Sequence, residues 1–217
     1  MHNMQNNMQS KHGLELLETR LEAIEQATTV QKPSYILTIV HERNVAKYAK
    51  KIALELGLNQ ERGEIELAAR FHDIGKITWP EELYTREMSK EEKLLYKETH
   101  NIKGFNIVKS VSLEIGITDG KLRTILDGIK FHHERYDGDV KCKYKAYPGE
   151  RDDGKIPLCA RIITVVDHFD AMISNRPYRK KDYTKEEALE DLVLKKEIEY
   201  DPEIVDVFVS IVQKEMS

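Results

Sequence analysis

Adjacent metal-binding side chains are the first feature of this sequence that could carry out chemistry. The chain has eight histidines, and two short motifs, His72-Asp73 and His132-His133, place two ligand groups side by side. Imidazole suits zinc, iron, manganese and nickel, and a carboxylate can bridge two ions. A single helical histidine is more often a hydrogen-bonded core residue than a ligand, and one histidine of the second pair could be structural. The adjacent pairs nevertheless favour a metal site.

Basic residues in two places could bind an anion. Lys76 follows Asp73 by one turn, where it either faces the same cavity or is a solvated residue at a helix end. Arg176, Tyr178 and Arg179 begin a second basic stretch. Arginine suits bidentate contacts with phosphate or guanine, and tyrosine suits base stacking. The alternative for this stretch is a solvated turn.

The composition argues against DNA and membrane surfaces as partners. The chain has 34 Lys and Arg against 38 Asp and Glu, and hence a formal net charge of −4. No apolar run approaches the roughly 20 residues that cross a bilayer, and no charged-then-apolar leader opens the chain. Cys142 and Cys159 form no CxxC motif and are predicted to be reduced thiols. We therefore expect a cytoplasmic protein that binds neither DNA nor membrane.

The elements that position these residues are predicted to be helices. Apolar side chains recur at steps of three and four along most of the chain, as in amphipathic helices. The pattern predicts helices at about 14–27, 34–56, 61–74, 89–113, 119–133, 156–174, 184–196 and 202–215. Ser34 is a candidate N-cap, and Gly57 a helix stop. Strand patterns are nearly absent, and Gly, Pro, Asp and Lys in residues 134–155 predict one long loop with at most a short ribbon. The fold class is therefore an all-α helical bundle.

The polar first dozen residues predict a frayed terminus, and the helix at 14–27 leads into the bundle. This helix could pack on the core or pair with a second copy. We therefore divide the chain into a polar N-terminus with a short lead-in helix, residues 1–33, and a main domain, residues 34–217.

Several sequence blocks, taken in order, resemble the signature of the HD-GYP family of cyclic dinucleotide phosphodiesterases. The blocks are HDIGK at 72–76, HHERYDG at 132–138, AYP at 146–148, IPLCARIITVVDHFDA at 156–171 and RPYR at 176–179. The resemblance extends over about 35–216. It implies a bundle of HD-domain type with the 134–155 loop over the site, and a catalytic domain at 34–217.

The resemblance also implies two divalent transition metals. One would be held by His41, His72, Asp73 and Asp167, and the other by His100, His132 and His133, with Asp73 bridging. Iron or manganese is usual in the family, and the ligand types also allow zinc and nickel. A water that bridges two such ions becomes hydroxide near neutral pH and attacks phosphorus.

Further roles follow from the same resemblance. Lys76 is implied as a catalytic charge beside the scissile phosphate, together with Asp73. Arg176, Arg179 and Tyr147 are implied as contacts of the dinucleotide. Asp170, one turn after Asp167, would orient a ligand histidine, or could simply cap its neighbour.

The chain departs from the family pattern in three ways. Leu37 stands where members with three metals carry a glutamate, so we expect two metals. The loop between Gly138 and Ala146 is expanded by six residues, so residues 139–155 are a candidate surface for a protein partner. About 33 residues precede the catalytic region, so we expect no fused sensor in this chain.

The leading hypothesis is hydrolysis of cyclic di-GMP at a binuclear metal centre. A broader HD-type nucleotide phosphohydrolase would share the metal ligands but would not need the RPYR block. A catalytically silent module that senses the dinucleotide is the third alternative. A homodimer through the 14–27 helix is also considered.

Overall fold

Helices account for all the regular structure in the residues that the computed structural model describes, which are 2–117, 120–139, 156–174, 181 and 183–216. Side chains are described from His12 onward, except that of Lys121. The α-helices are α1 (His2–Gln31), α2 (Ile36–Glu55), α3 (Arg62–Arg70), α4 (Lys90–Leu95), α5 (His100–Glu114), α6 (Gly120–Phe131), α7 (Leu158–Ile173), α8 (Lys185–Leu194) and α9 (Pro202–Met216). Short 3₁₀ helices are η1 (Pro33–Tyr35), η2 (Ile74–Thr78), η3 (Glu81–Tyr84) and η4 (Lys97–Thr99). The prediction of an all-α bundle is confirmed.

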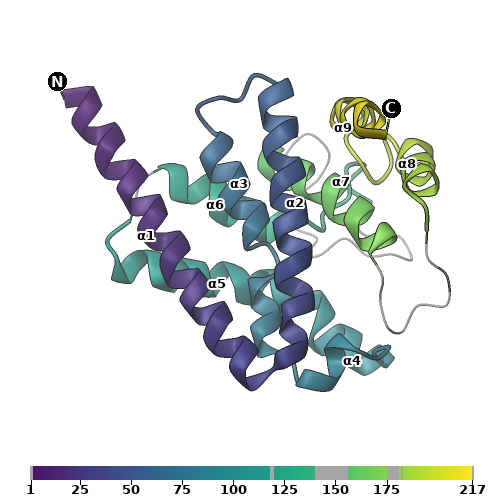
Figure 1. Ribbon diagram of the computed structural model, residues 1–217, viewed down its shortest axis with the longest axis horizontal. Coiled ribbons are helices and arrows are strands. Elements are labelled where there is room, and N and C mark those ends of the chain that lie inside the picture. Colours follow the sequence, from purple (N-terminus) through teal and green to yellow (C-terminus); the bar gives the residue numbers. More distant parts are fainter. Residues whose placement is uncertain (1, 118–119, 140–155, 175–180, 182, 217) are drawn as a thin grey trace.

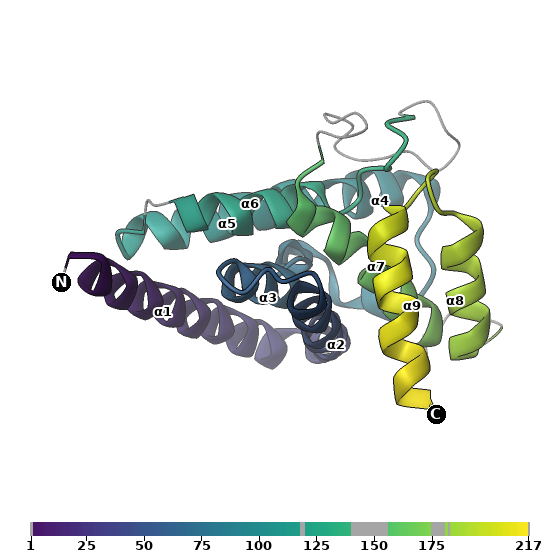
Figure 2. The ribbon, with the colours of Figure 1, turned by 90° about the horizontal axis from the view of Figure 1, so that it is seen from above.

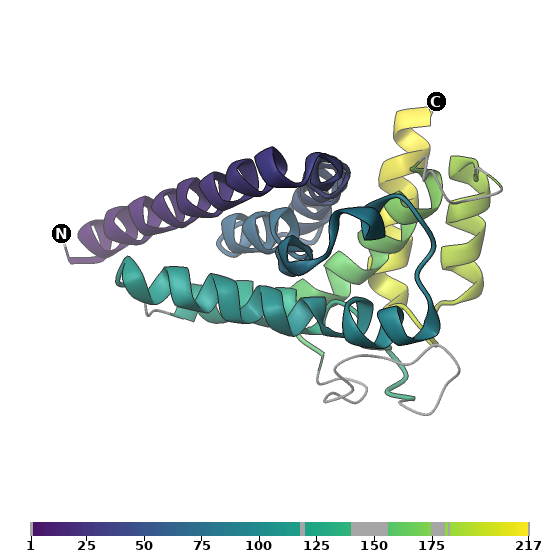
Figure 3. The same cartoon turned by 90° about the horizontal axis from the view of Figure 1, so that it is seen from below.

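The helices enclose one main hydrophobic core. α2 crosses the middle of the molecule, and α7, α8 and α9 lie on one side of it (Figure 1). Seen from above and from below, α3 lies between α1 and the layer of α5 and α6, and α2 is seen nearly end-on beside the C-terminal end of α1 (Figures 2 and 3). α7 is the most apolar of the central helices, and Ile162, Val166 and Phe169 are fully buried in the core. A smaller cluster around Tyr35 and Trp79 covers the region where α2 begins.

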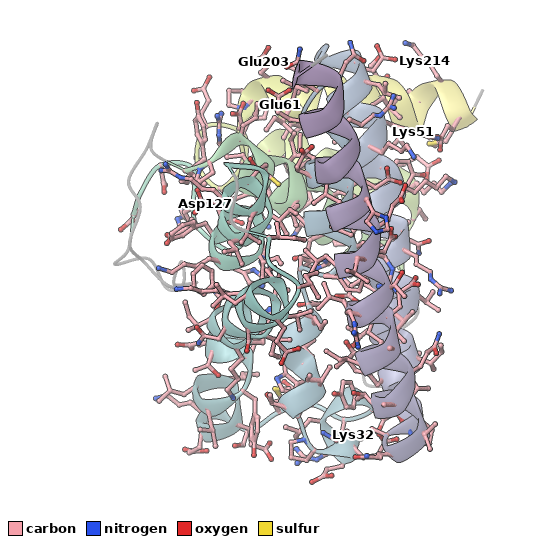
Figure 4. The ribbon with its side chains drawn as sticks, turned by 90° about the vertical axis from the view of Figure 1, so that its left-hand side faces the viewer. Lys32, Lys51, Glu61, Asp127, Glu203 and Lys214 are labelled. Atoms are coloured by element: carbon pink, nitrogen blue, oxygen red, sulfur yellow. The ribbon has the colours of Figure 1, made fainter. Side chains whose placement is uncertain are left out.

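α1 is much longer than the sequence predicts. It ends at Gln31, before Lys32-Pro33 as expected, but its backbone is helical from His2, so the prediction of a frayed first dozen residues is wrong. The stretch before Gly13 has no glycine or proline to interrupt a helix. Leu17 and Leu21 are fully buried, so α1 packs on the core. In Figure 4 it runs down the side that faces the viewer and ends near Lys32, at the opposite end of the molecule from Lys51 and Glu61.

α2 turns polar residues toward the interior. Ser34 is not its N-cap, because η1 precedes the helix and no side chain caps it. The predicted stop at Gly57 is confirmed, since this residue has φ +72°. Leu37 and Val40 are 43% and 52% exposed. The buried face at this end of α2 instead includes His41 and Glu42.

The predicted helix at 61–74 ends early, at Arg70. The backbone amide of Asp73 donates to the carboxylate of Glu42 at 3.1 Å instead of to a helical carbonyl. The chain then continues as η2. His72 and Asp73 therefore lie in a tight turn between two helical segments, which can present adjacent side chains to one site.

The predicted helix at 89–113 is divided in two. Ser89 and Glu92 form a capping box that starts α4. The helix then breaks, because the carbonyls of Tyr96 and Lys97 accept hydrogen bonds from the side chains of Trp79 and His100. α5 begins at His100, which places that imidazole at the edge of the core.

The remaining predicted helices are confirmed, with ends shifted by up to two residues in the described parts. Residues 134–139 carry no helix or strand, while the rest of the predicted loop and ribbon, with Cys142, lies outside the described residues. Cys159 is buried in the core with a free thiol. None of the helices in the described ranges combines the length and apolar content needed to span a bilayer. The domain boundary at residue 34 stays a prediction.

Gly75 is required where η2 meets α5. A Cβ at this position would lie 1.9 Å from the carbonyl oxygen of His100 and 2.7 Å from the amide nitrogen of Gly104. Both are backbone atoms, so a side chain would push η2 and α5 apart. The absence of a side chain at Gly75 thus keeps the HDIGK turn close to His100.

We predict that Gly75→Ala destabilises the protein by about 1 to 3 kcal/mol or more, as overpacking does, measured by thermal or urea unfolding. Gly63→Ala is the matched control, because no atom lies within 4 Å of its added Cβ. In a helix, this control should be neutral or stabilising by up to about 1 kcal/mol. A Gly75→Ala protein as stable as wild type would contradict the close approach.

Candidate metal centre

The structure brings together the side chains that the sequence proposes as metal ligands. They come from separate elements: His41 from α2, His72 and Asp73 from the turn after α3, His100 from α5, His132 and His133 from the end of α6, and Asp167 from α7. Most are buried, and His133 and Asp167 are half-buried. Residues up to 126 positions apart in the chain are therefore in hydrogen-bonding contact.

One group of ligand atoms surrounds one oxygen of Asp73. His41 Nε2 lies 2.9 Å from Asp167 Oδ1 and 3.8 Å from Asp73 Oδ2. His72 Nε2 lies 3.6 Å from the same Asp73 oxygen and 3.8 Å from Asp167 Oδ1. His41, His72 and Asp167 thus place three ligand atoms within 4.8 Å of one another.

A second group faces the other oxygen of Asp73. His100 Nε2 is 2.9 Å from Asp73 Oδ1 and 3.4 Å from His132 Nε2. The rings of His132 and His133 lie 4.1 Å apart between centroids. His100, His132 and His133 also place their ligand atoms within 4.8 Å of one another. Asp73 is therefore positioned between two groups of ligands, one oxygen toward each.

Hydrogen bonds hold the imidazoles with Nε2 toward this centre. The Nδ1 atoms of three histidines bond the carbonyl three residues earlier: His72 to Ala69 at 2.8 Å, His100 to Lys97 at 2.6 Å and His132 to Ile129 at 2.8 Å. His41 Nδ1 instead bonds Asp170 Oδ2 at 2.7 Å. A carbonyl can only accept a hydrogen bond, so Nδ1 donates in these three rings, and in the neutral form of such a ring Nε2 is the nitrogen that can bind a metal. Such contacts fix the ring and the tautomer of a metal-binding histidine.

His72 Nε2 gives the clearest test of whether a metal fits. This atom is buried and has no hydrogen-bond partner among the described residues. A buried polar atom without a partner is costly, and native structures rarely leave one unsatisfied. Two carboxylates lie just beyond hydrogen-bonding distance from it. A cation between these groups would satisfy the nitrogen and both carboxylates.

Electrostatics keep most of these groups in the protonation state that binds a metal. Burial lowers the pKa of His100 and His133, and lowers that of His132 to about 3. Burial alone would raise the pKa of Asp73, but Lys76 and the neighbouring imidazoles hold it well below its usual range.

His41 and Asp167 form a contrasting pair. Burial lowers the pKa of His41, but hydrogen bonds to Asp167 and Asp170 outweigh it and raise the pKa to about 9. Burial also opposes ionisation of Asp167, yet the imidazoles of His41 and His72 keep its pKa well below the usual range. Without a metal, therefore, a proton on His41 balances part of the negative charge.

Lys76 contacts the carboxylate of Asp73. Its ammonium forms an ion pair with Asp73 Oδ2 and lies 5.2 Å from the centroid of the Trp79 ring. The hydroxyl of Tyr84 donates to the Lys76 carbonyl, which anchors η2 against η3. Lys76 therefore faces the centre, and is not a solvated helix end.

The three substrate contacts that the sequence resemblance implies lie outside the described residues: Tyr147, Arg176 and Arg179. Leu37 is described, and is an exposed side chain one turn before His41. His168, next to Asp167 in sequence, pairs with Asp191 at 2.6 Å.

Glu42 contacts Asp73 and Arg70 contacts Glu42, and the sequence motifs predict a role for neither. Both have ionisable side chains and are buried, and Glu42 bonds the backbone of Asp73. The signal that could have revealed them is an ionisable residue beside a predicted ligand in a stretch predicted to be helical: Glu42 directly follows His41, and Arg70 lies two residues before His72.

Comparison with known proteins agrees with this geometry. The family model of the HD domain matches residues 15–204. A cyclic di-GMP phosphodiesterase of Thermotoga maritima is 32% identical over 187 residues, which cover 82% of this chain and 45% of the relative. The 3'3'-cGAMP-specific phosphodiesterase 2 of Vibrio cholerae is 27% identical over 89% of this chain and 35% of its own length. The chain thus spans less than half the length of these relatives.

The fold also has relatives among solved structures. Bd1817, an HDG"Y"P protein from Bdellovibrio bacteriovorus, superimposes with a TM-score of 0.63 at 18% identity, over 92% of this chain and 64% of that protein. The HD-GYP resemblance predicted from the motifs is confirmed, and the chain belongs to the HD-domain family.

Proposed function

We propose that the chain is a metal-dependent phosphodiesterase that hydrolyses a cyclic dinucleotide, with cyclic di-GMP as the first candidate substrate and 3'3'-cGAMP as the second. The observation that carries this proposal is the position of Asp73 between two groups of imidazoles. The relatives named above support the substrate class, because they are phosphodiesterases for these two dinucleotides.

The donor set fits two divalent transition metals. We assign His41, His72 and Asp167 to one ion, His100, His132 and His133 to the other, and Asp73 to both. Iron or manganese is proposed, with zinc and nickel also compatible, because nitrogen and oxygen ligands without thiolate suit all four. When bound, such a pair lowers the pKa of water and neutralises charge on a phosphate.

The chain's own residues orient the ligands and add positive charge. Asp170 holds the His41 ring through Nδ1. Lys76 is proposed as a catalytic residue whose ammonium stabilises negative charge that grows on the phosphate. Arg176, Arg179 and Tyr147 are proposed as substrate contacts on the sequence resemblance alone.

Other expectations stay predictions. These are the homodimer through residues 14–27, a protein partner at the 139–155 loop, and a cytoplasmic location. The broader phosphohydrolase and the silent sensor are separated from the proposed enzyme by the first experiment below.

Turnover and metal content measured on one sample test the function. Anaerobically purified protein should contain close to two transition metals per chain and cleave cyclic di-GMP, 3'3'-cGAMP or both. Asp73→Ala should lose both metal and turnover, because it removes the oxygens that face both ligand groups. Asp206→Ala, on an exposed carboxylate of α9, is the control that keeps both.

Two results would contradict the proposal. Loaded protein that leaves both dinucleotides intact would favour the silent sensor, and preferential cleavage of other nucleotides would favour the broader phosphohydrolase.

Lys76→Ala should keep both metals and reduce kcat by about 10² to 10³, as loss of one transition-state contact does. The physical reason is that its charge acts on the phosphate during the reaction. Steady-state kinetics with elemental analysis measure this. An unchanged kcat would show that Lys76 does not act on the phosphate. A rate that falls only in proportion to the lost metal would show that Lys76 serves only to hold Asp73.

The metal-free protein should lose stability in acid. His132 has a pKa of about 3 when folded and about 6.5 when unfolded. Between these values only the unfolded chain takes up the proton, so stability falls as the pH drops below about 6.5. This histidine alone accounts for about 2 kcal/mol at pH 5.

Urea unfolding of metal-free protein at pH 7 and pH 5 measures this effect. His132→Asn should show a smaller difference between the two pH values than wild type. An equal difference in both proteins would show that His132 is not held neutral.

A further inference from the structure

A buried carboxylate next to the first proposed ligand holds the backbone of the shared one. Glu42 follows His41 in α2 and its side chain is fully buried. Glu42 Oε1 accepts the Asp73 amide at 3.1 Å, and Glu42 Oε2 lies 3.4 Å from Arg70 Nη1. One side chain therefore connects the end of α3 with the HDIGK turn.

Arg70 extends this contact to α1. Its guanidinium is buried and donates to both carboxylate oxygens of Glu25, at 3.1 Å and 2.5 Å. Glu25 is itself buried in α1, and Tyr35 also donates to it, at 3.4 Å. The residues Glu25, Arg70 and Glu42 form a continuous buried chain from α1 to Asp73, here named the α1–Asp73 chain.

α1 also contacts the far end of the same segment. Lys32, directly after α1, donates through Nζ to the carbonyl of Ile77 at 2.6 Å. The segment between Arg70 and Ile77 carries His72, Asp73 and Lys76, so α1 and the residue that follows it hold both ends of this segment.

Stability alone does not account for the α1–Asp73 chain. Burying two carboxylates and one guanidinium costs desolvation energy, and apolar side chains of similar size are often as stabilising or more so. What apolar side chains cannot supply is an acceptor for the Asp73 amide. A shift of this amide would move the carboxylate relative to the imidazoles on either side of it.

We infer that Glu42 is a positioning residue of the metal centre, which fixes Asp73 through its amide, and that Glu25 of α1 holds Glu42 in place through Arg70. The inference rests on the proposed function, because it gives Asp73 the role of shared ligand. α1 is then part of the machinery of the site, and displacement of α1 weakens metal binding.

A pair of triple variants separates positioning from stability. Both carry Glu25→Leu and Arg70→Met, which remove the buried charges. One adds Glu42→Leu, and the other adds Glu42→Gln, which keeps an oxygen that can accept the Asp73 amide. We expect both to fold with similar unfolding midpoints, because no unpaired buried charge remains in either.

Two readouts apply to these variants. In metal-free protein, hydrogen exchange at the Asp73 amide should be faster with Glu42→Leu than with Glu42→Gln. Competition with a chelator should show Mn²⁺ affinity about 10 to 100 times lower for the Leu variant, as for other residues that orient ligands. Equal exchange and equal affinity in the two variants would overturn the inference.

The single variant Glu25→Leu tests the contribution of α1. It should speed exchange at Asp73, while Glu22→Leu should not, because Glu22 is 3.9 Å from Arg70 and its side chain is 41% exposed. If the two variants changed hydrogen exchange at the Asp73 amide equally, α1 would have no role in positioning Asp73. A wild-type protein that cleaves no dinucleotide would end the proposed function, while the exchange of Asp73 still decides the role of Glu42.

Discussion

The carboxylate of Asp73 is the group on which the site depends, because its two oxygens face two different sets of imidazoles. One oxygen is near His41 and His72, and the other is near His100. Such a carboxylate, almost fully buried, is stable only beside positive charge. Lys76 supplies one such charge in the structure. The groups around Asp73 are therefore complementary to cations, and the rest of the fold holds these groups in position.

Each ligand is placed by a local feature with a simple physical cause. The early end of α3 creates the turn that presents His72 and Asp73, and the break before α5 starts a new helix at His100. The lack of a side chain at Gly75 lets these two segments approach closely. Carbonyls three residues earlier then aim three of the imidazoles at the centre. Burial keeps most of the rings neutral, which is the state that binds metals.

The sequence predicts well those features that depend on local patterns. Periodic apolar residues predict nearly all the helices, and the spaced motifs predict which side chains meet, although their roles as ligands stay predictions. Features set by distant partners are not predictable in this way. The breaks at Arg70 and near Tyr96 arise because side chains from other elements bond the backbone. The inward face of α2 is polar at its start, so apolar periodicity misplaces Leu37 and Val40. The pairing of Glu25, Arg70 and Glu42 likewise joins three helices and leaves only unexplained charges in the sequence.

The central claim is that two metals are held on either side of Asp73. Anomalous diffraction from crystals of the Mn²⁺-loaded protein tests it most directly. We predict two anomalous peaks about 3.5 to 4 Å apart, one near His41, His72 and Asp167 and one near His100, His132 and His133. A single peak, no peak in this region, or a third peak beside Leu37 would contradict the account.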